Sequence, residues 1–156
     1  MTVPIGQNAP PFDLHDQNRN AVTLESLRGR NALIVFIPFP FTGRCEGELC
    51  AIRDRYSELK DLDANVIAIT CDTLPANKAW SDANGFTFPV LSDFWPHGDV
   101  SRAYGVFNEQ FGCADRVTFV LDEDGNVHDV VASDGLGFSR EFDTYAASLR
   151  ALTTKR

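Results

Sequence analysis

The sequence predicts an α/β domain in which helices pack around a central mixed β-sheet. Short apolar runs rich in β-branched residues alternate with segments of helical periodicity, and this alternation ends in a hairpin followed by a helix. The chain has 156 residues, 44% of them hydrophobic and 23% charged, which fits one globular domain with a substantial core. We therefore take residues 1–156 as a single domain.

The elements are expected in the following order. Residues 12–16 and 21–23 flank the polar turn 17–20 and predict a hairpin. One helical turn then ends at Gly29, and a later helix ends at Gly85. The Asp124-Gly125 pair predicts the turn of a second hairpin. The remaining segments are expected as strands at 33–37, 65–70, 88–91, 116–121 and 127–131, and as helices at 24–27, 45–62, 76–84, 100–104 and 142–152.

The most informative stretch follows the strand 33–37 and reads Pro38-Phe-Pro-Phe-Thr42-Gly-Arg44-Cys45-Glu-Gly-Glu48-Leu-Cys50. A strand, a proline-containing loop and a helix place Cys45 in the first helical turn. Unpaired backbone N–H groups and the positive end of the helix dipole favour an anion there. The Cys45 thiol should therefore lose its proton readily and act as a nucleophile. The alternative is a small buried hydrophobic residue, the usual role of a free cysteine.

Helical periodicity indicates which way each side chain of this helix points. At about 100° per residue, one narrow apolar stripe forms that faces the sheet. Glu48 lies beside this stripe, whereas Cys50 points about 140° away from Cys45. The stripe consists of Cys45, Leu49, Ile52, Tyr56 and Leu59.

The pattern Pro-x-x-x-Thr-x-x-Cys over residues 38–45 resembles the active-site signature of the peroxiredoxins, which are thiol peroxidases. The segments 86–98, 103–106 and 116–120 follow in that family's order. The Asp-Phe-Trp-Pro-His-Gly and Gly-Val-Phe-Asn-Glu-Gln stretches resemble the alkyl hydroperoxide reductase E subfamily of actinobacteria. The resemblance extends from about Gly6 to about Leu152. It implies a thioredoxin-like fold with an amino-terminal β-hairpin.

The resemblance also implies roles for individual residues in the reduction of hydrogen peroxide and organic hydroperoxides. Cys45 would attack the peroxide and become a sulfenic acid, and Pro38 would shield the thiolate from water. Arg116 would reach the cysteine and bind developing negative charge, although an arginine at a strand start is usually a surface residue. Thr42 would donate a hydrogen bond to the thiolate or the peroxide, or else cap the helix. Glu48 matches a carboxylate of the family, whose role stays open.

The oxidised Cys45 must then be reduced, and Cys50 is the candidate resolving cysteine. The Cys-x4-Cys spacing matches the bacterioferritin-comigratory branch of peroxiredoxins. Residues five apart in a helix have Cα atoms about 8.6 Å apart, beyond the limit of about 7 Å for a disulfide, so the helix start would have to unwind. The alternative is a one-cysteine cycle in which Cys50 is incidental. Cys113 is a weaker candidate resolver, and Cys71 is expected to be buried and inert.

The resemblance further implies the partners. A hydroperoxide is the substrate, and the reductant is thioredoxin, a glutaredoxin-like or mycoredoxin-like protein, or a low-molecular-weight thiol. A homodimer is expected, and no bound cofactor or metal. Four aromatic residues could line an apolar rim for organic peroxides, or else serve as core or dimer contacts. These are Phe39, Phe41, Phe86 and Trp95.

Composition excludes several other classes. A net charge of −8 argues against nucleic acid as a partner. No apolar run reaches the roughly 18 residues of a membrane span, and the first residues lack the pattern of a signal peptide, so a cytoplasmic protein is expected. A thioredoxin-type disulfide exchanger would need Cys-x-x-Cys, and a zinc site is disfavoured because the three histidines are scattered. A peroxide sensor or chaperone would share the same cysteine chemistry and stays open.

Overall fold

The computed structural model describes residues 2–133 and 140–153, and gives the backbone but not the side chains of Arg44 and Cys45. A seven-stranded sheet, in the order β2-β1-β5-β4-β3-β8-β9, runs through the middle of the fold. Its strands are β1 (Asp13–His15), β2 (Ala21–Thr23), β3 (Asn31–Phe36), β4 (Ala64–Thr70), β5 (Val90–Ser92), β8 (Val117–Leu121) and β9 (Val127–Ala132). The helices are η1 (Glu25–Leu27), α1 (Gly43–Asp54), α2 (Tyr56–Asp61), α3 (Leu74–Asn84), α4 (Asp99–Ala103) and α5 (Phe142–Thr153).

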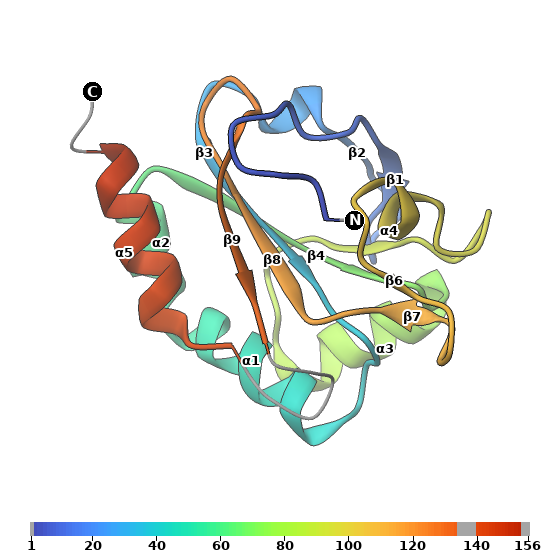
Figure 1. Cartoon of the computed structure of the whole chain (residues 1–156). Coiled ribbons are helices and arrows are strands. Elements are labelled where there is room, and N and C mark those ends of the chain that lie inside the picture. Colours follow the sequence, from blue (N-terminus) through green and yellow to red (C-terminus); the bar gives the residue numbers. More distant parts are fainter. Residues whose placement is uncertain (1, 134–139, 154–156) are drawn as a thin grey trace.

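The sheet is mixed, as the sequence predicts. Strands β3, β4 and β5 are parallel, so their carboxyl ends meet at one edge of the sheet. Strands β1 and β8 run antiparallel to β5 and β3, and β9 and β2 extend the sheet at its two sides. Strand β3 is buried over its whole length and leads at the carboxyl edge into the loop before α1. The fold therefore places the first turn of α1 at this edge, near the centre of the sheet (Figure 1).

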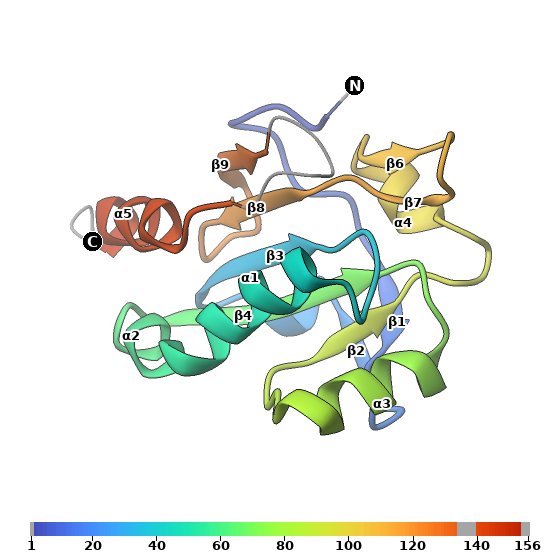
Figure 2. The ribbon, with the colours of Figure 1, turned by 90° about the horizontal axis from the view of Figure 1, so that it is seen from below.

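The two faces of the sheet are covered by different parts of the chain. Alternate residues of β3 show this, because Leu33 and Val35 pack with residues of α1, α2, α3 and α5, while Ile34 and Phe36 pack with the amino-terminal segment, η1 and α4. Figures 1 and 2 show this division, with α4 on the side away from α1 and α3. Alternation along a strand that is buried on both faces produces such a three-layer arrangement.

Most predicted elements are confirmed, and three differ for identifiable reasons. The helix expected to continue to Leu62 is interrupted at Arg55, whose guanidinium binds Glu58 and Asp143 of α5, so the bend accompanies the packing of α5. Strand β5 begins only after Pro89, which has no amide hydrogen for a ladder. A small hairpin of β6 (Phe107–Asn108) and β7 (Cys113–Ala114) was not predicted, because two-residue strands are too short to show a period.

A buried glutamine joins the amino-terminal hairpin to the sheet. The side-chain amide of Gln17 donates to the Phe88 carbonyl at 3.0 Å, and its oxygen accepts from the Val90 amide at 2.8 Å. The Gln17 side chain therefore makes, at the start of β5, the backbone hydrogen bonds that a neighbouring strand would otherwise make. Removing it leaves a buried backbone donor and acceptor without their partner.

We expect Gln17→Ala to lower the free energy of unfolding by about 2 kcal/mol, because buried unpaired polar groups are costly. Urea unfolding followed by circular dichroism measures this. Asn18→Ala, at an exposed position of the same turn, is the matched control and should unfold like the wild type. Equal midpoints for both variants would contradict the role of Gln17.

Candidate active site

Cys45 is the third residue of α1, so its backbone lies in the first turn of the helix, as predicted. The inward orientation predicted for its thiol concerns a side chain outside the described part of the structure. The loop before the helix contains Pro38, which is buried. It also contains Phe41, whose φ of 64° lies in the left-handed region that bulky residues rarely adopt. The backbone is therefore strained immediately ahead of the candidate nucleophile.

Thr42 occupies the N-cap position of α1, with extended φ and ψ of −98° and 145°. Its side chain makes no capping hydrogen bond to the described residues of the helix. The hydroxyl instead donates to the Phe39 carbonyl at 2.9 Å. Thr42 therefore occupies the N-cap position through its backbone, while its hydroxyl bonds to a carbonyl of the preceding loop.

Glu48, one turn along α1 from Cys45, binds two arginines in the interior. Arg116 Nη1 donates to Glu48 Oε1 at 2.5 Å, and Arg140 donates to Glu48 through both its backbone N and its Nε at 2.7 Å. Arg140 also donates to the Phe36 carbonyl and to the Thr118 hydroxyl. The side chains of Glu48, Arg116 and Arg140 are only 3%, 4% and 0% exposed. The surface alternative for Arg116 is therefore wrong.

The charges in this cluster fix the protonation of Glu48. Burial alone would raise the pKa of the Glu48 carboxyl, but hydrogen bonds and charge from Arg140, together with the charge of Arg116, outweigh it and lower the pKa. Among the described residues, two guanidinium groups face this one carboxylate, one turn along α1 from Cys45. Such a cluster can stabilise a thiolate and the oxygen that leaves a peroxide.

The other three cysteines have different surroundings. Cys50 is half-buried on α1, with its Sγ 3.8 Å from Oδ1 of Asn84 on α3, rather than on an open face. Cys71 is buried beside the Ser101 hydroxyl, and burial raises the pKa of its thiol to about 11. The prediction of an inert Cys71 thus agrees with its surroundings. Cys113 is buried in β7, which disfavours it as a resolving cysteine.

The four aromatic residues expected at an apolar rim do not form one group. Phe39 and Phe41 are partly exposed in the loop before α1. Phe86 is a core residue, stacked on Phe88 and packed against Trp80, so of its two predicted alternatives the core role is confirmed. Trp95 lies on the loop after β5 and is 82% exposed.

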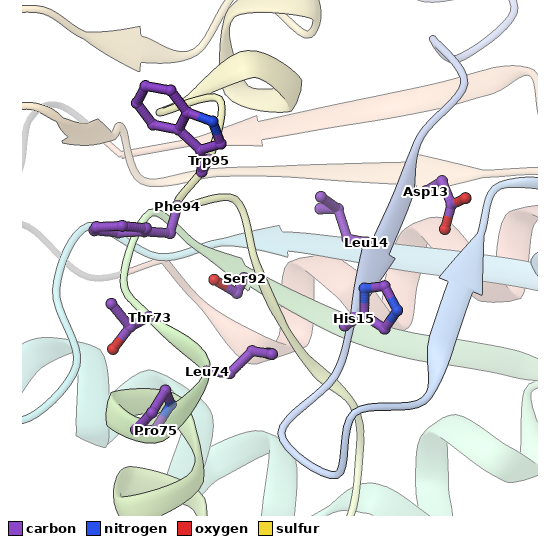
Figure 3. Close-up of a pocket in the computed structure, with 9 residues that line it drawn as sticks. All are labelled: Asp13, Leu14, His15, Thr73, Leu74, Pro75, Ser92, Phe94 and Trp95. Atoms are coloured by element: carbon purple, nitrogen blue, oxygen red, sulfur yellow. The ribbon is translucent and has the colours of Figure 1, made fainter.

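Trp95 lines a separate cavity of about 360 Å³ between β1, β5 and the start of α3. Figure 3 shows Phe94 and Trp95 at one end of this cavity and side chains of β1 across from them. None of the residues expected to do chemistry lines it. Over the described residues, no group of His, Cys, Asp or Glu is arranged to hold a metal ion. No helix there is long and apolar enough to cross a membrane.

Comparison with known proteins gives the family. Residues 5–130 match the model of the AhpC/TSA family. The chain belongs to this peroxiredoxin family. Alkyl hydroperoxide reductase E of Mycobacterium tuberculosis is 53% identical to the chain over 122 residues, which cover 78% of this chain and 80% of that protein. Alkyl hydroperoxide reductase C of Staphylococcus aureus is 32% identical over 148 residues, covering 92% and 76% of the two chains.

Solved structures confirm the predicted thioredoxin-like fold. Peroxidoxin BcpB from Mycobacterium tuberculosis superposes with a TM-score of 0.85 at 30% identity and covers 95% of this chain and 97% of that one. The AhpC structure from Enterococcus faecalis has a TM-score of 0.87 at 27% identity, covering 97% and 92%. Family membership and these relatives also confirm the predicted enzyme class, a thiol-dependent peroxidase.

Sequence reasoning missed Arg140, the residue with the most hydrogen bonds to Glu48. Arg140 lies 92 positions after Glu48 and directly before the last helix. A lone arginine before a helix carries no periodic signal, and its burial follows only from the packing of α5 on the sheet. The one usable signal was Glu48 itself, because a carboxylate beside an inward stripe requires a cationic partner.

We expect Glu48→Gln to make stability less dependent on acid pH. The pKa of Glu48 is lower in the folded protein than in the unfolded chain, where it is about 4.3. The ionised carboxylate therefore stabilises the fold fully above the unfolded-state pKa, and this stabilisation is lost as the pH falls through the folded-state pKa. Urea unfolding between pH 3 and 7 measures this slope. At pH 7 the loss should be about 3 kcal/mol, because the variant breaks the buried ion pairs that Glu48 makes with Arg116 and Arg140.

Glu58→Gln is the control for this experiment, because Glu58 pairs with Arg55 at a partly exposed position of α2. Exposed ion pairs contribute little, so this variant should keep the wild-type pH profile. If the stability of Glu48→Gln depends on pH as steeply as that of the wild type, Glu48 is not the buried, ionised partner of the two arginines.

Proposed function

We propose that Cys45 is the peroxide-reacting cysteine of this peroxidase and that Arg116 serves it directly. The observation that supports this most is the ion pair between Arg116 and Glu48, since Glu48 lies one turn beyond Cys45 on the same helix. Pro38 is assigned to shielding and Thr42 to hydrogen bonding. Glu48 holds the Arg116 guanidinium in place, and Arg140 in turn holds the Glu48 carboxylate.

In the proposed reaction the Cys45 thiolate attacks one oxygen of the hydroperoxide and the O–O bond breaks. The sulfur is oxidised to a sulfenic acid, and the other oxygen leaves as water or an alcohol after taking up a proton. Backbone N–H groups at the start of α1 and the Arg116 guanidinium stabilise the developing negative charge. The Thr42 hydroxyl donates to Phe39 before substrate arrives, so it would have to rotate to donate to the peroxide.

Resolution is proposed to occur through Cys50. Its thiol attacks the sulfenic sulfur, a disulfide forms and water leaves. A thiol reductant then restores both cysteines: thioredoxin, a glutaredoxin-like or mycoredoxin-like protein, or a low-molecular-weight thiol. The one-cysteine cycle with an external thiol is the second candidate, favoured by the contact of Cys50 with Asn84, which holds it away from the helix start.

The setting of the enzyme is also a proposal. A cytoplasmic location would suit this chemistry, because a reducing compartment keeps cysteine thiols reduced. A homodimer is supported by the subfamily resemblance and by the exposed aromatic side chains of Phe94 and Phe111.

Arg116→Ala should slow peroxide reduction by at least tenfold, because the departing oxygen loses its cationic partner. Stopped-flow oxidation with hydrogen peroxide measures the rate. Arg102→Ala, on the exposed side of α4, is the matched control and should react at the wild-type rate. A near-wild-type rate for a folded Arg116→Ala protein would exclude a direct role for this arginine.

Intact mass after one equivalent of hydroperoxide should separate the two cycles. Loss of two hydrogens in the wild type, with gain of one oxygen in Cys50→Ser, supports an internal disulfide. Gain of oxygen in the wild type supports the one-cysteine cycle. If Cys45→Ser consumes peroxide as fast as the wild type, the assignment of Cys45 is wrong.

A further inference from the structure

One face of α1 is joined to α3 by three polar contacts. Trp80 Nε1 donates to Glu46 Oε1 at 3.1 Å, at the start of α1. Cys50 Sγ lies 3.8 Å from Asn84 Oδ1, and Arg53 Nη1 donates to the Asn84 backbone carbonyl at 2.6 Å. Positions 46, 50 and 53 are spaced i, i+4 and i+7, so they share one helical face. We call these three contacts the α1–α3 seam.

Trp80 is the fixed member of this seam. Its side chain is completely buried and packs edge-on against Phe86, with ring centroids 5.3 Å apart. Its ring also lies 6.4 Å from that of Phe41, in the loop before the helix. The indole therefore contacts residues on both sides of Cys45 in the chain, Phe41 before it and Glu46 after it. Its buried N–H has Glu46 as acceptor, and a buried donor without a partner is unfavourable.

The turn that Trp80 contacts has little intrinsic stability. Gly43 and Gly47 both lie in the first five residues of α1, and glycine is a poor helix former. The N-cap side chain does not bond to the described helix amides, and Phe41 ahead of it has a strained backbone. Contacts from elsewhere in the fold must therefore hold this turn in helical form.

Closing a disulfide between Cys45 and Cys50 requires the opposite change. In an intact helix their Cα atoms are about 8.6 Å apart, and a disulfide permits about 7 Å. The first turn must unwind, and Cys50 must leave Asn84. The seam contacts of Glu46 and Cys50 oppose this step.

We infer that Trp80 is a positioning residue, which holds the Cys45 turn in helical form through Glu46 and Phe41. The proposed function assigns peroxide attack to the folded turn and disulfide closure to the unwound turn. Trp80 therefore favours attack on the peroxide and slows closure of the disulfide. Its loss slows oxidation of Cys45 but speeds condensation of the sulfenic acid with Cys50, in which the disulfide forms and water leaves.

The first test does not depend on catalysis. Trp80→Phe keeps an aromatic ring and removes only the N–H and part of the indole. Amide hydrogen exchange in a peptide covering residues 43–49 should become about tenfold faster, while exchange in α5 stays unchanged. Trp95→Phe, which alters an exposed indole on another loop, is the control and should exchange like the wild type. Unchanged exchange of residues 43–49 in Trp80→Phe overturns the inference.

The second test measures chemistry in a Cys50→Ser background, where no internal disulfide forms. Trp80→Phe should oxidise at Cys45 about tenfold more slowly by stopped flow, the effect of losing one hydrogen bond to a charged acceptor. Glu46→Leu should show the same loss, without further loss in the double variant. Glu46→Gln keeps an oxygen acceptor and should react within about threefold of the parent. Additive losses in the double variant overturn the coupling between Trp80 and Glu46.

The third test restores Cys50 and uses excess hydrogen peroxide. Intact mass then gives the ratio of disulfide to sulfinic acid, which should rise in Trp80→Phe. A general folding defect would slow oxidation without favouring the disulfide, so a lower or equal ratio overturns the inference. If the Cys50→Ser parent gains no oxygen at Cys45, the proposed function fails, while hydrogen exchange still decides the placement of Trp80.

Discussion

The buried carboxylate of Glu48 is the interaction on which the rest of this site depends. It forms buried ion pairs with two interior guanidinium groups, and a buried charge is strongly unfavourable unless it is paired. Through it α1, the residue before β8 and the segment before α5 meet at the carboxyl edge of the sheet. A carboxylate that looks secondary in the sequence therefore links three distant segments, and its charge state follows from them.

The catalytic helix is supported on two sides that differ in chemistry. The Arg116–Glu48–Arg140 cluster fixes its inner side with charged hydrogen bonds inside the protein. The α1–α3 seam fixes another side with the Trp80 indole and the Asn84 carbonyl. In the proposed reaction the first support supplies positive charge for the reacting oxygen. The second governs whether the turn that carries Cys45 is folded.

This division suits the proposed two-cysteine cycle, in which one thiol takes part in two incompatible steps. Attack on peroxide needs a helix start with its amides and dipole in place, whereas an internal disulfide needs the same turn unwound. A turn rich in glycine, preceded by a strained Phe41, is held largely by tertiary contacts. Such a turn can open without disturbing the sheet, because the apolar residues of α1 that anchor it, Leu49 and Ile52, lie beyond it.

The sequence by itself determined the α/β class, the peroxiredoxin resemblance and the position of Cys45 in a first helical turn, since strand runs, glycine stops and motif spacing are local. Even the position of Glu48 beside the inward stripe followed from the helical period. Only the tertiary structure decided that Arg140 shares Glu48 with Arg116, that Thr42 bonds to Phe39, and that Trp80 reaches Glu46. Those contacts join residues far apart in the chain or depend on one side-chain rotamer. Periodicity and composition do not indicate which side chains the packing of the fold brings into contact.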